Sequence, residues 1–421
     1  MAWPPQMESV KKRRIVLSFL VSLSVITFLD RLCIAVSGPK IQGELGISPT
    51  QWGWVLGAFV FANGILAIPS GGLGDRFGQR KVLTTIALWW SAFTFLTGMA
   101  TSFTGLWLTQ LLFGAGEAGA YPNITGSIRR WIPREERARA QGYVWGASRA
   151  GGALAPVLVV PLQAAWGWRA SFWVFGFVGL VWACVWYACY RDADPEQENT
   201  GSVGSAGAVA VASKPILIPW SSLYRSRQIR LITAMYFCYA WGSWFFMSWF
   251  PTYLVNGRGL TMGEMGFFSA FPFLLGMLGN FVGGHLSDSF VRKFGLKLGR
   301  RLIGSAALLA SGLLVLIAAL VRGKVVVIAL LPAAFGIMDL MLPSAWAACI
   351  DVGGEHAGAV SGAMNTAGLC GGFCCTVLFG YIVRLTGNYN LPLLVIGTMV
   401  LVSASLFVRI DATQQLEAGN A

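Results

Sequence analysis

Ionisable side chains within apolar stretches are the residues of this sequence that could do chemistry. They are Asp30, Arg31, Glu117, Arg149 and Asp339. At the centre of a membrane-spanning helix each costs roughly 2.5–3.5 kcal/mol, and such residues usually mark a pathway or a relay. A carboxylate removed from water favours its protonated form and can load and release a proton, and a guanidinium donates two parallel hydrogen bonds to a carboxylate. The set therefore indicates proton and anion chemistry, although acid–base pairs that only hold helices together would use the same residue types.

The composition shows what kind of element must position these residues. Of the 421 residues, 55% are hydrophobic and only 12% are charged, whereas a soluble domain carries about 25% charged residues. The net charge of +13 is spread in short clusters between apolar runs and not gathered on one tail or face, as nucleic-acid binding would require. The composition excludes a soluble enzyme, and we expect no nucleic-acid partner.

Apolar runs of about 20 residues, the length that spans a bilayer, recur along the whole chain. We predict an all-α integral membrane protein with twelve transmembrane helices in two pseudo-symmetric six-helix bundles, embedded in the lipid bilayer. The predicted spans are residues 15–37, 51–73, 82–102, 105–127, 140–164, 168–190, 230–255, 263–286, 300–321, 324–349, 357–382 and 390–409.

The positive residues orient these spans. Most of the 31 Lys and Arg residues lie in loops on the same side as the N-terminus. Because cytoplasmic loops carry the excess of positive charge, we predict a multi-pass protein of the cytoplasmic (inner) membrane with both termini in the cytoplasm.

A polar segment rich in glycine, serine and alanine divides the chain. We predict an N-terminal six-helix bundle (1–190), a cytoplasmic linker (191–229) and a C-terminal six-helix bundle (230–421). Residues 71–81, after the second span, and residues 283–293, after the eighth, carry Gly, Asp and Arg-Lys in the same order. One signature at equivalent places in two halves implies an internal parallel repeat, as in many secondary transporters.

The loop after the second span also identifies a family. The sequence Gly-x-Leu-x-Asp-Arg-x-Gly-x-Arg, from Gly71 to Arg80, resembles the signature loop of the major facilitator superfamily, and the resemblance covers the whole chain. Within that superfamily the chain is similar to the anion:cation symporters, which include bacterial galactonate and hexuronate transporters and animal sialic acid and vesicular glutamate carriers. The supporting stretches are Asp30-Arg31 and residues 114–122, 249–254 and 361–368.

The resemblance implies roles for individual residues. The acids that match Asp30 and Glu117 are implicated in proton coupling, and the arginine that matches Arg31 in binding the substrate anion. Further substrate-binding candidates are Asn63, Gln110, Tyr121, Ser148, Tyr239, Ser344 and Asn365. The gating candidates, expected to close the cytoplasmic side and to release it in the inward-open state, are Asp75, Arg76 and Arg80, with Asp288 and Arg292 as a weaker second copy.

The departures from the family pattern leave alternatives open. Gln110 stands where the family often has an arginine, and Arg149 is the candidate to replace that cation. Alternatively, Arg149 is a helix-packing residue paired with Glu117 or Asp339. Asp339 either pairs with Arg149 across the two halves or is a second protonatable site, and Asp30 could serve only to neutralise Arg31.

These observations predict a function. We expect a secondary transporter that moves a small organic anion, a sugar acid or another monocarboxylate, together with protons in the same direction. The alternative is an anion exchanger without proton coupling. We expect a monomer that is not an enzyme and has no cofactor. No nucleotide-binding loop occurs, and the two histidines and eight cysteines lack the spacing of a metal site.

Overall fold

Apolar helices form nearly all of the structure, a computed structural model that describes residues 5–71, 73–132, 136–191, 225–354 and 357–414. The first half contains α1 (Pro5–Leu45), α2 (Pro49–Gly71), α3 (Leu73–Phe77), α4 (Gln79–Thr97), α5 (Phe103–Glu117), α6 (Ala120–Trp131), α7 (Arg137–Trp166) and α8 (Trp168–Cys189). The second half contains α11 (Arg227–Ser248), α12 (Phe250–Thr252), the π-helix η2 (Tyr253–Gly257), α13 (Met262–Phe268), α14 (Phe271–Leu320), α15 (Lys324–Asp339), α16 (Met341–Gly353), α17 (Ala357–Thr386) and α18 (Leu391–Phe407).

Counted over the described residues, these helices make twelve passes that match the predicted spans. Two of the predicted spans are broken near their middles, into α5 and α6 and into α15 and α16. Conversely, α14 contains two passes, because Gly295 adopts a positive φ of 78° and the chain turns back there. Within the described residues, five helical stretches are long and apolar enough to span a membrane by length and composition alone. One of them, Met262–Leu320, includes both passes of α14.

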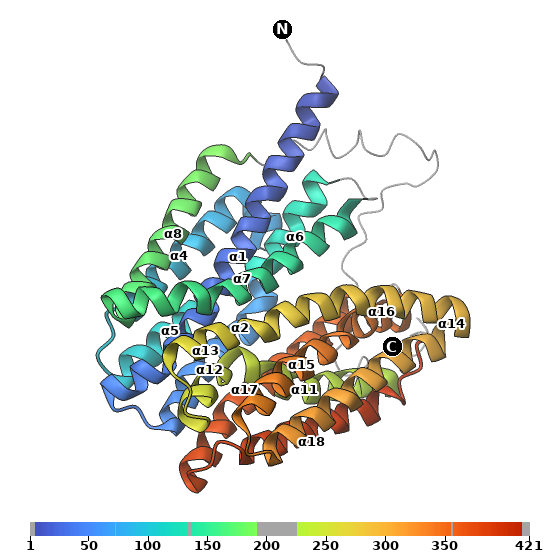
Figure 1. Ribbon diagram of the computed structural model, residues 1–421. Helices are drawn as coiled ribbons and strands as arrows, with labels where there is room; N and C mark the ends of the chain where they lie inside the picture. Colours follow the sequence, from blue (N-terminus) through green and yellow to red (C-terminus); the bar gives the residue numbers. More distant parts are fainter. Residues whose placement is uncertain (1–4, 72, 133–135, 192–224, 355–356, 415–421) are drawn as a thin grey trace.

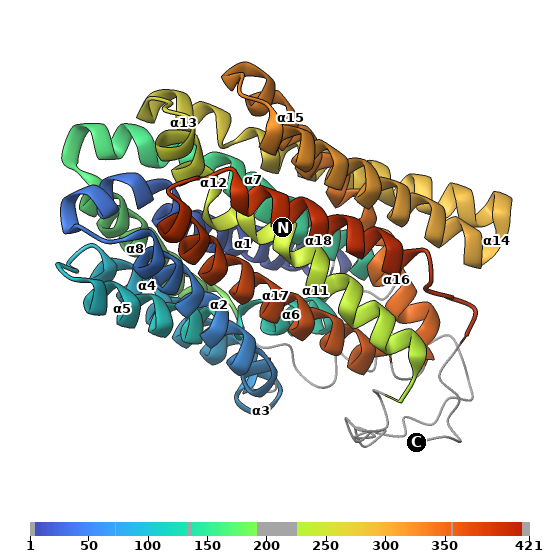
Figure 2. The same ribbon diagram turned by 90° about the horizontal axis from the view of Figure 1, so that it is seen from below.

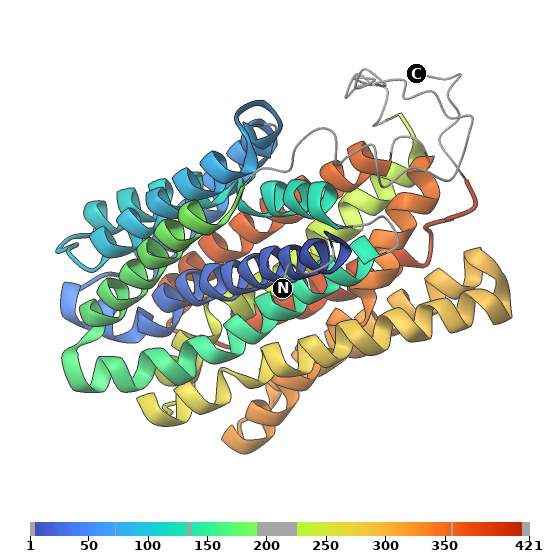
Figure 3. The same ribbon diagram turned by 90° about the horizontal axis from the view of Figure 1, so that it is seen from above.

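The helices pack in two groups that follow the halves of the sequence. In the first half, α1 packs along α7 (Figure 3) and α4 packs against α8. In the second half, α14 and α15 run side by side along one flank (Figure 2), and α11 packs against α17 and α18. The predicted linker, apart from residue 191 and residues 225–229, lies outside the described residues.

The two halves lie close together at one end of the molecule and splay apart towards the other (Figure 1). The splayed end holds the start of α1, α3 and the end of α18 (Figure 1), and we call it the proximal end. The opposite end, where the halves lie close together, is the distal end. At the distal end, a Cβ on Gly53 would lie 2.7 Å from the Thr376 carbonyl oxygen, so α2 and α17 approach backbone to backbone. Gln42 also donates to Thr252 Oγ1 at 3.5 Å there.

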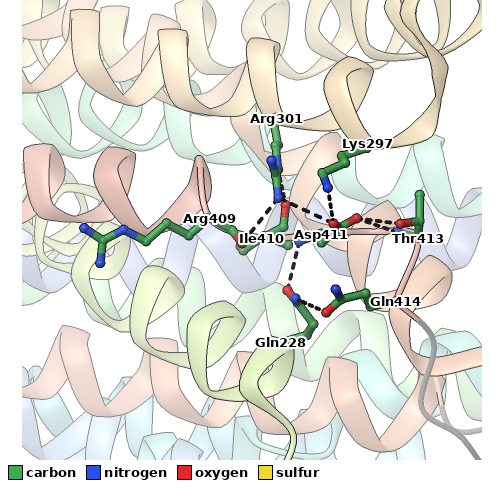
Figure 4. Close-up of polar contacts among 8 residues, drawn as sticks. All are labelled: Gln228, Lys297, Arg301, Arg409, Ile410, Asp411, Thr413 and Gln414. Atoms are coloured by element: carbon green, nitrogen blue, oxygen red, sulfur yellow. Dashed lines mark hydrogen bonds and ion pairs between the residues drawn. The ribbon is translucent and has the colours of Figure 1, made fainter.

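A polar cluster holds the second half together at its proximal end (Figure 4). Lys297 Nζ lies 2.6 Å from Asp411 Oδ2, and Thr413 Oγ1 donates to Asp411 Oδ1 at 2.6 Å. The backbone N–H of Asp411 donates to Gln228 Oε1, which ties α11 to the segment after α18. Burial alone would raise the pKa of Asp411, but its hydrogen bonds with Lys297 and Thr413 lower it from 3.8 to about 2.

Candidate functional site

Two helix breaks place the central acids. The first break follows Glu117, the last residue of α5, and the second follows Asp339, the last residue of α15. Proline has no N–H group, and its ring clashes with the carbonyl group four residues earlier. Pro122 acts in this way on Ala118, and Pro343 on Asp339. Each break lies directly after an acid and leaves backbone groups free of the helical ladder.

The first ion pair lies within the N-terminal half. Arg31 on α1 donates through Nη2 to Glu117 Oε1, and the guanidinium lies 4.9 Å from the ring centroid of Phe28 and 5.0 Å from that of Phe59. Arg31 Nε and Glu117 Oε2 have no hydrogen-bond partner among the described residues. The pair therefore keeps one donor and one acceptor free.

Asp30 does not neutralise its neighbour Arg31 by direct contact. It is 4% exposed, and neither of its carboxylate oxygens has a hydrogen-bond partner within the part of the chain that the structure describes. An ionised carboxylate buried without a partner is very costly. Asp30 is therefore a site at which a bound proton relieves a large desolvation cost.

The second ion pair joins the two halves. Arg149 Nη2 on α7 lies 2.8 Å from Asp339 Oδ2 on α15, and the guanidinium lies 5.2 Å from the centroid of the Phe335 ring. Tyr239 Oη donates to Asp339 Oδ1 at 3.1 Å, and Asn280 Nδ2 donates to Asp339 Oδ2 at 3.1 Å. Of the alternatives left by the sequence, the structure shows the pairing of Arg149 with Asp339.

Tyr121 connects the surroundings of the two pairs. Its hydroxyl group lies 2.8 Å from Ser148 Oγ, next to Arg149 in the chain, and its ring stacks on Trp145 at 4.9 Å between centroids. Tyr121 follows Glu117 by four residues and Ser148 directly precedes Arg149, so this hydrogen bond joins the segments that carry the two ion pairs. The surroundings of the two ion pairs are therefore connected by a direct hydrogen bond.

Exposure separates the cations from the acids. The side chains of Arg31 and Arg149 are each 14% exposed, whereas those of Glu117 and Asp339 are 1% and 0% exposed. The accessible part of each ion pair is thus the arginine side chain, whereas its acid is buried. This arrangement can receive an anion and can hold protons on the acids that the anion displaces.

The other substrate-binding candidates differ in their burial and in their contacts. Asn63 is half-buried on α2, one turn after Phe59, and Asn365 is exposed on α17. Ser344 is fully buried on α16, and its hydroxyl group has no hydrogen-bond partner among the described residues. Gln110 is not brought to either pair, because its amide donates to Thr97 Oγ1 on α4 at 3.3 Å.

The gating candidates of the first half lie at the proximal end. Arg80 donates through Nε to the Tyr187 carbonyl oxygen at 2.8 Å, and Arg76 is exposed and lies over Phe77. The Asp75 side chain lies outside the described residues. The contact of Arg80 with Tyr187 and that of Arg76 with Phe77 both lie within the N-terminal half.

In the second half, the structure shows an ion network that the sequence did not single out. Arg300 pairs with Asp288 at 3.3 Å and with Asp351 on α16 at 3.3 Å, whereas Arg292 donates to Ser289. Arg300 lies beyond the repeated loop signature, so only its position at the start of a span, opposite an acid at the end of another, could have indicated it. Asn280 and Phe335 were missed as well, because an amide and an aromatic ring in an apolar helix carry no distinctive pattern.

Comparisons with known proteins identify the family of this chain. The family model of the Major Facilitator Superfamily matches residues 20–374. A probable sulfoacetate transporter of Cupriavidus necator is 32% identical over 95% of both chains. A hexuronate transporter of Bacillus subtilis is 29% identical over 94% of this chain and 93% of its own, and a probable L-galactonate transporter of Escherichia coli is 28% identical over 91% of this chain and 86% of its own.

A solved structure shares the fold. It is an inward-facing bacterial homologue of the human lysosomal transporter Spinster, which superposes with a TM-score of 0.81 at 18% identity and covers 97% of this chain and 99% of that one. The family and these relatives are transporters and not enzymes. The family model matches most of the chain, the relatives align over nearly its whole length, and the helices form two halves of six passes each. The chain therefore belongs to the Major Facilitator Superfamily and is a multi-pass membrane transporter.

Proposed function

We propose that the protein carries a small organic anion together with protons across the cytoplasmic membrane, by alternating access. The observation that supports this most directly is the pairing of two part-exposed arginines with two fully buried acids. The relatives named for sulfoacetate, hexuronate and L-galactonate support an organic acid as the substrate class.

The coupling follows from competition for one cation. A substrate anion that binds Arg31 takes the place of Glu117, and a carboxylate left in a site closed to water is stabilised by a proton. By reciprocity, a proton on Glu117 frees Arg31 and raises the affinity for the anion. Anion and proton then load together and leave together, which is symport. Asp30, buried and unpartnered next to Arg31, is the alternative site for this proton.

Alternating access would rock the two halves about the central site. We assign the splayed proximal end to the cytoplasm, because the Lys and Arg clusters of the sequence belong to that side. In this assignment the structure is open inwards, and Asp75, Arg76 and Arg80 would meet the C-terminal half when the proximal end closes. Asp288 and Arg292 would act there as the second copy. We further propose that the two bundles, 1–190 and 230–421, move as units and that the transporter acts as a monomer.

Reconstitution into liposomes tests the proposal. Radiolabelled sulfoacetate, glucuronate and L-galactonate are offered with and without an inwardly directed proton gradient, and we expect accumulation of at least one of them only with the gradient. Glu117→Gln should still bind that anion and exchange it across the membrane, yet fail to accumulate it. Glu264→Gln, an exposed capping residue near the distal end, is the matched control and should accumulate normally.

Two results would contradict the proposal. Accumulation that survives in Glu117→Gln would remove this acid from the coupling. Counterflow in the unmodified protein that does not respond to the proton gradient would instead indicate an anion exchanger without proton coupling.

A further inference from the structure

The two acids of the central site occupy equivalent places in the internal repeat. Each follows a glycine by three residues, in Gly114-Ala-Gly-Glu117 and in Gly336-Ile-Met-Asp339, and each ends the first segment of a broken span. The glycines are also equivalent in contact. A Cβ on Gly114 would lie 2.4 Å from the Phe59 carbonyl oxygen on α2, and one on Gly336 would lie 2.7 Å from Leu275 on α14. The fold thus builds the same acid position twice.

The cations that serve these acids are not equivalent. Glu117 receives its cation from α1 of its own half. The place opposite Asp339 in the second half is taken by Tyr239 on α11, a neutral donor, and the cation Arg149 comes from α7 of the other half. Within its own half Asp339 thus receives the neutral donor Tyr239. Its cation, Arg149, comes from across the interface between the halves.

The formal charges of the two ion pairs cancel. Arg31 and Arg149 carry two positive charges, and Glu117 and Asp339 carry two negative charges. The remaining charged or titratable groups near Glu117 are Asp30 on α1 and Tyr121 on α6. Those near Asp339 are Tyr239 and Tyr236 on α11. Among these described groups no further cation is present to neutralise added negative charge.

A monoanion would engage one arginine and leave the other still covered by its acid. A dianion would engage both, since the two arginine side chains are equally exposed at 14% and the hydrogen bond between Tyr121 and Ser148 joins the segments that carry the two ion pairs. It would displace both acids from their cations. Each displaced acid is buried, so each requires a proton in place of the cation it has lost. One dianion and two protons add no net charge to the site.

We propose that the site takes a small dianion, with one anionic group on Arg31 and the other on Arg149, and carries it with two protons, one on Glu117 and one on Asp339. This inference rests on the proposed proton-coupled transport of organic anions and specifies its substrate charge and its stoichiometry. Arg149 and Asp339 are accordingly the residues that distinguish dianions from monoanions.

The test compares a dianion with a monoanion of nearly the same shape. Sulfoacetate is the dianionic probe and sulfoacetamide, in which an amide replaces the carboxylate, is the monoanionic one. In proteoliposomes with a trapped pH dye, we expect two protons to enter per sulfoacetate, with uptake insensitive to an imposed membrane potential. Binding of sulfoacetamide to the purified protein should be weaker by about tenfold or more, because a charge-assisted hydrogen bond is lost. Malonate and its monoamide repeat the comparison with carboxylates only.

A variant at the second acid tests its share of the protons. Asp339→Asn should carry one proton per sulfoacetate, so that uptake becomes sensitive to the membrane potential. Glu264→Gln serves again as the control and should keep two. If Asp339→Asn fails to fold, the comparison of the two anions in the unmodified protein still decides the matter.

Failure of this inference can be told from failure of the proposed function. Equal affinity for both anions, or one proton per sulfoacetate in the unmodified protein, would overturn the dianion proposal while leaving proton-coupled transport intact. Transport that ignores the proton gradient for every anion would overturn both.

Discussion

The ion pair between the two halves offers the sharpest test of the site's energetics. Asp339 is fully buried and receives its hydrogen bonds from Arg149, Tyr239 and Asn280. Asp339→Asn keeps the size of the side chain but leaves the Arg149 guanidinium without its counter-charge. Arg149→Gln leaves the carboxylate alone instead. We expect either single change to destabilise the protein and the double change to cost much less than their sum.

The magnitude follows from the geometry of the pair. With the nearest N and O atoms 2.8 Å apart, the charge centres are separated by about 4 Å, which corresponds to an attraction of about 4 kcal/mol at an effective dielectric constant of 20. Removal of one partner of a buried pair costs about 3–5 kcal/mol, because the other charge stays buried. Replacement of both partners by neutral groups removes that penalty, so the coupling energy should exceed about 1 kcal/mol.

The assay is a double-mutant cycle on unfolding in detergent, monitored by tryptophan fluorescence. The surface pair of Arg169 with Glu44, whose side chains are 28% and 48% exposed, provides a matched cycle with an expected coupling of about 0–1 kcal/mol. If the losses for Arg149→Gln and Asp339→Asn add to within about 0.5 kcal/mol of the double variant, the pair is not energetically coupled. The charge balance of the central site would then be refuted as well.

We expect definite outcomes for three further amino-acid substitutions. Asp411→Asn should cost roughly 1–2 kcal/mol of unfolding free energy at pH 7. The pKa of Asp411, lowered from 3.8 to about 2, stabilises the folded state above pH 3.8, and this stabilisation is lost as the pH falls towards 2. An unchanged unfolding free energy at pH 7 would contradict this. Gly114→Ala should cost about 1–3 kcal/mol of unfolding free energy in a thermal unfolding assay, since its Cβ would lie 2.4 Å from the Phe59 carbonyl oxygen. The control Gly146→Ala, whose Cβ would meet nothing within 4 Å, should be neutral in that assay. Arg31→Gln should abolish substrate binding in a thermal-shift assay without unfolding the protein, and retained affinity would leave this arginine a purely structural role.

The sequence predicted the passes well because burial in lipid imposes a simple rule. Runs of about 20 apolar residues must be helices there, and the repeated loop signature divided them into two halves. Helix ends were less predictable. The first helix extends over Pro5–Leu45 although hydropathy marked only residues 15–37, since hydropathy detects the apolar part of a helix and not its polar ends.

Partners within the site were beyond the reach of sequence patterns. Arg31 follows Asp30 directly, yet successive side chains on a helix point in different directions, and Arg31 meets Glu117 instead. Likewise, no local signal distinguished Glu117 from Asp339 as the partner of Arg149, because the choice depends on how two halves far apart in the chain pack together. Pro122 and Pro343 indicate the breaks after the two acids in principle. That prediction also requires the knowledge that each proline lies about one turn after an acid in the middle of a pass.

The two ion pairs differ in what their separation does to the molecule. Loss of the contact between Arg31 and Glu117 rearranges charges within one half, whereas loss of the contact between Arg149 and Asp339 removes a bond between the halves. An anion that binds Arg149 therefore replaces an inter-half contact by its own, and a proton on Asp339 stabilises the separated state. A ligand can shift a conformational equilibrium only by its difference in affinity for the two states. The pair of Arg149 with Asp339 supplies such a difference, because it links the charge of the cargo to the contact that holds the halves together.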